Sequence, residues 1–127
     1  MRMSNIMAVL LNGIAQFEFD RERVMPKDQA QYLDNMDAKM ATGIVLEGKT
    51  TANPDINQRA QFVAQNLAQA IKADNEPMAG AMTSWLATRL PELKQVKIDD
   101  ADAGVAIELV FDEEYRSQVA VQFDSLH

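Results

Sequence analysis

Apolar side chains recur at helical spacing near the start of the chain. Between Ile6 and Phe17 they follow an i, i+3, i+4, i+7 pattern, which is typical of one face of a helix. The competing interpretation is a strand over 15–19, where Phe17 and Phe19 alternate with polar residues. We favour a helix over about residues 4–16, followed by an extended segment.

A second helical pattern begins at Pro26, whose missing N–H does no harm in the first turn of a helix. Leu33 and Met40 continue the helical period, and Gly43 is the expected end of the segment. The apolar stretch after it, Ile44–Gly48, is either a short strand or a tight connection.

The third helical pattern has the strongest start signals in the chain. We expect Asn53 as the N-cap, Pro54 at the first helical position, and Asp55 as a favourable charge at the positive end of the helix dipole. Apolar residues from Ile56 to Ile71 then form one continuous stripe along the predicted helix.

A fourth helix is predicted almost at once. Either Asp74 or Asn75 can cap it, it continues to about Arg89, and Pro91 ends it. Because the link to the preceding helix is so short, we expect the two helices to form an antiparallel hairpin.

After Pro91 the period of the apolar residues changes from 3.6 to two, which predicts three strands of an antiparallel meander. The expected inward-facing residues are Val96 and Ile98, then Val105, Ile107, Leu109 and Phe111, then Val119, Val121 and Phe123. The outer face of the middle strand would present Ala106, Glu108 and Val110. Loops are expected over 99–104 and 112–116.

These elements predict one α+β domain over residues 1–127. In it, a helical layer that includes the antiparallel helical hairpin packs on a C-terminal three-stranded antiparallel meander.

Side chains suited to catalysis near neutral pH are scarce. The chain has no cysteine, and its one histidine is the terminal residue His127. Imidazole and thiolate serve most nucleophilic, acid–base and transition-metal chemistry, so these enzyme classes are disfavoured. We expect no catalytic residues, no metal site and no cofactor.

The formal net charge of −7 is concentrated late in the chain, where residues 99–114 hold seven acids and no base. Binding to nucleic acids or anionic membranes needs clustered Lys and Arg, so neither is an expected partner.

The longest apolar run, Ile6–Leu11, is far shorter than the roughly 20 residues of a membrane span. We therefore expect a cytoplasmic protein.

The acidic stretch resembles a calcium loop only at its start. With Asp100 and Asp102 as first and third ligands, Val105 takes the place of the required glycine and Phe111 that of the final glutamate. We instead expect this surface to bind a protein partner with a basic surface, or a second copy of the chain. The candidate partner-binding residues are Asp99, Asp100, Asp102, Glu108, Asp112, Glu113, Glu114 and Tyr115.

The segment from Phe17 to Arg23 offers an alternative site. Glu18 and Asp20 alternate there with two aromatic residues, and Arg21 and Arg23 could each clamp an anionic ligand. The simpler interpretation is a solvated surface with local ion pairs, which contribute little.

Two further patterns are weighed against simpler explanations. The pairs Met36/Met40 and Met78/Met82 are spaced i, i+4. We interpret them as core packing, and the alternative is a methionine-rich groove for a partner helix.

Gly43–Thr50 matches the phosphate-loop pattern G-x-x-x-x-G-K-T. However, it follows a predicted helix, and the next helix begins too late for its N-terminus to receive a phosphate. We interpret this match as chance, and the alternative is nucleotide hydrolysis through Lys49 and Thr50.

The leading expectation is therefore a small non-catalytic protein-interaction domain, acting as an accessory or regulatory subunit through its acidic surface. The alternative is a small-molecule binding domain or modest enzyme that uses the Glu18–Arg23 segment.

Overall fold

A computed structural model describes residues 5–115 of the chain, as an α+β structure with three helices and a mostly antiparallel sheet. The chain divides into two compact units, each described by itself below. The sheet unit comprises Met1–Arg21 and Glu92–His127, and the helical unit comprises Glu22–Pro91. The prediction of a single domain over 1–127 stays a prediction, as does the packing of the helical layer on a meander.

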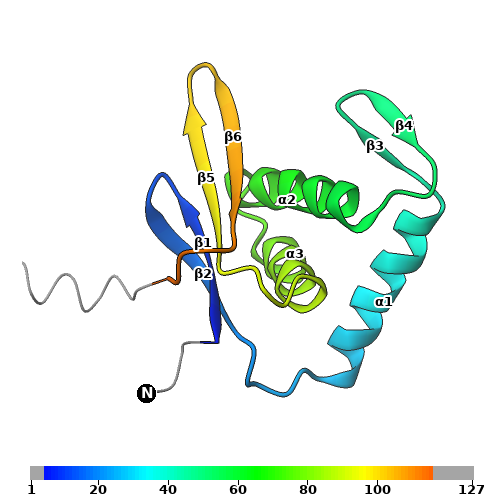
Figure 1. Cartoon of the computed structure of the whole chain (residues 1–127), viewed down its shortest axis with the longest axis horizontal. Coiled ribbons are helices and arrows are strands. Elements are labelled where there is room, and N and C mark those ends of the chain that lie inside the picture. Colours follow the sequence, from blue (N-terminus) through cyan, green and yellow to red (C-terminus); the bar gives the residue numbers. More distant parts are fainter. Residues whose placement is uncertain (1–4, 116–127) are drawn as a thin grey trace, which may run out of the picture. The chain divides into compact units, whose positions relative to one another are not determined.

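The sheet unit contains four strands in the order β2-β1-β5-β6, coloured blue, yellow and orange in Figure 1. Its strands are β1 (Ile6–Leu11), β2 (Ile14–Asp20), β5 (Gln95–Ala101) and β6 (Gly104–Val110). Strands β1 and β2 are antiparallel, β5 and β6 are antiparallel, and β1 and β5 are parallel.

The predicted helix over 4–16 is wrong, because the described part of this segment forms the β1–β2 hairpin. Asn12 and Gly13 make its two-residue turn with φ of 50° and 82°, the left-handed backbone that an Asn-Gly turn favours. Strand β1 lies inside the sheet, and its consecutive residues Met7, Ala8 and Val9, which point to alternate faces, are all fully buried. A strand covered on both faces carries a continuous apolar run, which also fits a helical period.

The predicted strands around Val96 and Ile107 are confirmed as β5 and β6. The loop expected over 99–104 is shorter than predicted, because β5 continues to Ala101 and β6 begins at Gly104. The third strand expected over 119–123 lies outside the described residues.

The predicted inward face of β6 needs correction. Val105 and Phe111 are exposed, whereas Val110, which was assigned to the outer face, is buried. Alternation along a strand is therefore a poor guide to burial toward the tip of this hairpin, since neither face of β6 is buried there.

The helical unit contains α1 (Lys27–Ala41), α2 (Ile56–Lys72) and α3 (Glu76–Arg89), together with a small hairpin of β3 (Ile44–Leu46) and β4 (Lys49–Thr51). Helices α2 and α3 pack against each other, and α1 contacts α3. Three of the four predicted helices are thus confirmed. The stretch after Gly43 is a strand of a hairpin, which resolves the two alternatives left open for it.

The start of α2 differs from the prediction by two residues. Asn53 has a left-handed backbone with φ of 53°, and the N-cap is Asp55. Asp55 accepts a hydrogen bond from the Gln58 N–H at 2.8 Å, and its own N–H donates to Gln58 Oε1 at 2.9 Å, forming a capping box. Helix α3 begins as predicted, with the Asn75 side chain accepting from the Met78 N–H.

One side-chain network fastens α1 to α3. The indole N–H of the buried Trp85 donates to Asp37 Oδ1 at 2.7 Å, and the Arg89 guanidinium donates to Asp37 Oδ2 at 2.6 and 3.0 Å. Asp34 accepts a further bond from Arg89 at 3.1 Å. Both oxygens of Asp37 are therefore engaged across these two helices.

Candidate functional site

The acidic residues predicted to bind a partner lie together on one supersecondary element. Asp99 and Asp100 belong to β5, Asp102 to the turn, and Glu108 to β6, while Asp112, Glu113 and Glu114 follow β6 directly. We call these seven residues the acidic surface. Lys97 is the one base between Gln95 and Tyr115. The element is the β5–β6 hairpin of Figure 1 with the segment after it.

Local contacts hold the segment after β6 against β5. Lys97 Nζ lies 3.2 Å from Glu113 Oε1, and Gln95 Nε2 donates to the Glu113 carbonyl oxygen at 2.9 Å. Lys97 is also directly opposite Glu108 in the register of the two strands. The pair between Lys97 and Glu113 is solvent-exposed, with relative exposures of 40% and 66%, so it positions the segment without adding much stability.

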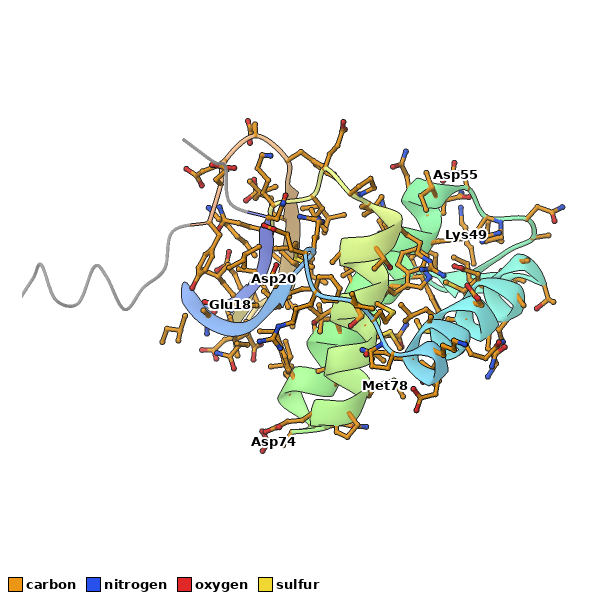
Figure 2. All side chains as sticks on the ribbon, turned by 90° about the horizontal axis from the view of Figure 1, so that it is seen from below. Glu18, Asp20, Lys49, Asp55, Asp74 and Met78 are labelled. Carbon is orange, nitrogen blue, oxygen red and sulfur yellow. The ribbon has the colours of Figure 1, made fainter. Side chains whose placement is uncertain are left out.

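Tyr115 and Glu18 were assigned to different candidate sites, but the structure brings them together. The Tyr115 hydroxyl donates a hydrogen bond to Glu18 Oε2, across 97 positions of sequence. Figure 2 shows Glu18 and Asp20 along β2. The end of the acidic segment is therefore attached to the strand that carries the alternative site.

Arg21 has a structural contact that the sequence did not predict. Its guanidinium Nη2 donates to the carbonyl oxygen of Leu93, 72 positions away. Partial burial lowers the pKa of Arg21 by desolvation, although an arginine remains charged at neutral pH. Arg23 is exposed and falls within the helical unit. In the Glu18–Arg23 segment, at least one of the two arginines, Arg21, is therefore already hydrogen-bonded to a backbone carbonyl.

The phosphate-loop match has the geometry of a β-hairpin. Glu47 and Gly48 make the turn between β3 and β4, and Lys49 lies in the second strand (Figure 2). Helix α2 begins only at Ile56. A phosphate loop needs a strand, a glycine-rich loop and a helix in immediate succession, so this segment cannot cradle phosphate in that way.

Within residues 5–115, no group of three or more His, Cys, Asp or Glu side chains is arranged to hold a metal ion. In the same described part of the chain, no helix combines the length and hydropathy needed to cross a membrane.

The helical unit contains a cavity of about 780 Å³, which the sequence did not predict as such. Helices α1, α2 and α3 and the β3–β4 hairpin all contribute to its wall. Its apolar lining includes Tyr32, Met36, Met40, Val45, Phe62, Met78 and Met82. A pocket of this size and polarity is typical of a small-molecule site.

The interpretation of the paired methionines as core residues holds for only one of them. Met40 is buried, whereas Met36 and Met82 are half-buried and Met78 is 36% exposed. All four line the cavity. The i, i+4 spacing was the sequence signal for this site, because it places two flexible apolar side chains on one face of each helix.

Comparisons of the chain with protein families, curated proteins and solved structures gave no match.

Proposed function

We propose that this protein is a non-catalytic interaction domain of the cytoplasm, an accessory or regulatory subunit that binds a basic protein surface. The observation that carries the proposal is the concentration of seven acidic side chains on the β5–β6 hairpin and the segment after it. Such a surface accelerates and orients the encounter with a basic partner.

Apolar side chains beside these acids add contact area. Val105 on β6 is 41% exposed and Phe111 just after it is 45% exposed. β6 is also an edge strand of the sheet formed by the described residues. Interfaces commonly combine apolar contacts with a polar rim, and an edge strand can pair with a segment of another chain.

The test is quantitative capture from extracts of cells that make the protein, with matched charge reversals. Asp99→Lys with Asp102→Lys changes the acidic surface, and neither carboxylate is hydrogen-bonded by another side chain in the described structure. Glu47→Lys with Glu92→Lys gives the same change in net charge outside that surface. The first variant should lose a partner that the wild type captures at low salt, and the second should keep it. Capture that survives the first variant or high salt contradicts the proposal.

Small-molecule binding is the second candidate, and the cavity in the helical unit is the observation that favours it. The Glu18–Arg23 segment is a weaker choice for that role. Arg21 donates to a backbone carbonyl and Glu18 accepts from Tyr115, so a ligand clamp there would compete with contacts already made.

A further inference from the structure

The charge of the cavity wall differs from that of the chain. The protein has 19 acidic and 12 basic side chains, yet the cavity is lined by no carboxylate and by one charged side chain, Lys39. An acidic protein that leaves carboxylates out of an apolar pocket provides a wall that does not repel an anion.

Lys39 lies in the last turn of α1 and has no ion-pair partner among residues 5–115. Thr42 and Gly43, which come after α1, and Ile44 and Val45 of β3 also line the cavity. The hydroxyls of Tyr32 and Thr50, on the same wall, are without a hydrogen-bond partner in the described part of the chain. One cation and two hydroxyl groups are therefore available to a polar group of a ligand.

We propose that this cavity binds a single-chain amphiphile with an anionic head group, of the fatty-acid class. The acyl chain lies against the methionines and Phe62, and the head group meets the ammonium of Lys39. This inference rests on small-molecule binding, the second candidate function.

The apolar part of the wall suits a flexible chain. Met36, Met40, Met78 and Met82 come from two helices, and unbranched thioether side chains adapt to ligands of variable shape. A volume of about 780 Å³ also lies in the usual range of about 300–1,000 Å³ for small-molecule pockets.

The charge of the wall favours this ligand over a partner helix. An amphipathic helix presents a row of charged and polar groups beside its apolar face. The cavity wall offers one point charge, Lys39, which matches one carboxylate.

Calorimetric titration of the full-length protein with saturated fatty acids of increasing length, and with n-alkanols of the same lengths, tests the proposal. Affinity should rise about fourfold for each added CH₂ until the cavity is filled, since each buried CH₂ contributes a near-constant increment. The acid should bind more tightly than the alcohol of equal length. Lys39→Gln should weaken acid binding about threefold to fivefold, the scale of an exposed ion pair, and leave the alcohol unchanged.

Lys27→Gln is the matched control, because Lys27 is an exposed lysine of the same helix that does not line the cavity. Met78→Glu should abolish binding of both ligands, and Met78 is exposed enough for the variant to fold. Ile56→Glu places the same charge on an exposed apolar residue outside the cavity and should bind normally.

The outcomes separate this inference from the function on which it rests. If alcohols bind as tightly as acids and Lys39→Gln has no effect, small-molecule binding stands and the anionic class is wrong. If neither series binds at any chain length, the amphiphile class is wrong, and small-molecule binding has to be tested separately with ligands of other classes. Binding that survives Met78→Glu would place the site elsewhere and overturn the proposal. A synthetic amphipathic helix that binds the wild type but not Met78→Glu, with no binding of fatty acids, would assign the cavity to a protein partner.

Discussion

The two units of this protein differ in where they place charge and where they leave space. The sheet unit has eleven acidic and five basic side chains, whereas the helical unit has eight and seven. Nearly all of the net charge of −7 therefore belongs to the sheet unit. The cavity of about 780 Å³ belongs entirely to the helical unit. A net negative charge kept only for solubility need not be concentrated in one unit, so the contrast favours a specific role for the acidic surface.

The carboxylates also have different surroundings in the two units. In the helical unit, Asp37 receives hydrogen bonds from an indole and a guanidinium, and Asp55 caps a helix. In the sheet unit, Glu113 has one exposed ion pair with Lys97, the only base of the acidic hairpin. The comparison therefore predicts that Asp37 and Asp55 contribute to stability, whereas the acids of the acidic surface contribute to binding.

The largest expected effect tests whether the two units unfold together. Ile98 in the interior strand β5 is 1% exposed, and Ile98→Ala should lower the free energy of unfolding by about 3 kcal/mol. Trp85, the only tryptophan of the chain, belongs to the helical unit, whereas Ile98 belongs to the sheet unit. If residues 1–127 form one domain, Ile98→Ala should lower the midpoint of urea unfolding by the same amount whether unfolding is followed by Trp85 fluorescence or by far-UV circular dichroism.

Val105→Ala is the control for this experiment, because Val105 lies in the same sheet but is exposed, and its effect should stay within about 0.5 kcal/mol. If Ile98→Ala leaves the urea midpoint of the Trp85 fluorescence transition unchanged, the single-domain prediction is wrong and the chain forms two domains.

The next largest expected effect is the loss of stability when single carboxylates of the two units are removed. Asp37→Ala leaves the buried Trp85 N–H without its acceptor and removes two bonds from Arg89, so it should cost about 2 kcal/mol. Asp34→Ala removes one bond at an exposed position and should cost less than about 1 kcal/mol. Asp99→Ala on the acidic surface should cost nothing measurable. Urea unfolding of the three variants ranks them, and an Asp99 variant as destabilised as the Asp37 variant would contradict the division of roles.

The sequence predicted those elements whose signals are local. Pro26, Asn75 and Pro91 mark helix boundaries within one turn, and they were interpreted correctly. The β1–β2 hairpin was missed although Asn12-Gly13 is a strong local turn signal. The apolar run before that turn fits a strand buried on both faces as well as a helix, and the choice depends on sheet neighbours, one of which is β5, far away in sequence.

The candidate sites likewise separate into features with a local sequence signal and features that depend on residues far apart in the chain. Acids close together in sequence stayed together on one hairpin, because a hairpin preserves sequence proximity in space. The contacts of Glu18 with Tyr115 and of Arg21 with Leu93 join residues far apart in the chain, so no local pattern could reveal them. The methionine pairs were placed on the correct helices. Whether they face a core or a cavity depends on how the helices pack, which their spacing does not determine.

The smallest effect on stability concerns Lys97, and it sharpens the proposed role of the acidic surface. Lys97→Gln removes an exposed ion pair and should change the free energy of unfolding by less than about 1 kcal/mol. It also removes the only base of the acidic hairpin, so affinity for a captured basic partner should rise about twofold to threefold, and more at low salt than at high salt. Lys49→Gln makes the same change in net charge on an exposed strand of the helical unit and should leave affinity unchanged. Equal gains from both variants would mean that net charge, and not this hairpin, attracts the partner. A gain confined to Lys97→Gln would place the contact on β5 and β6, since a screened charge acts only within about 10 Å.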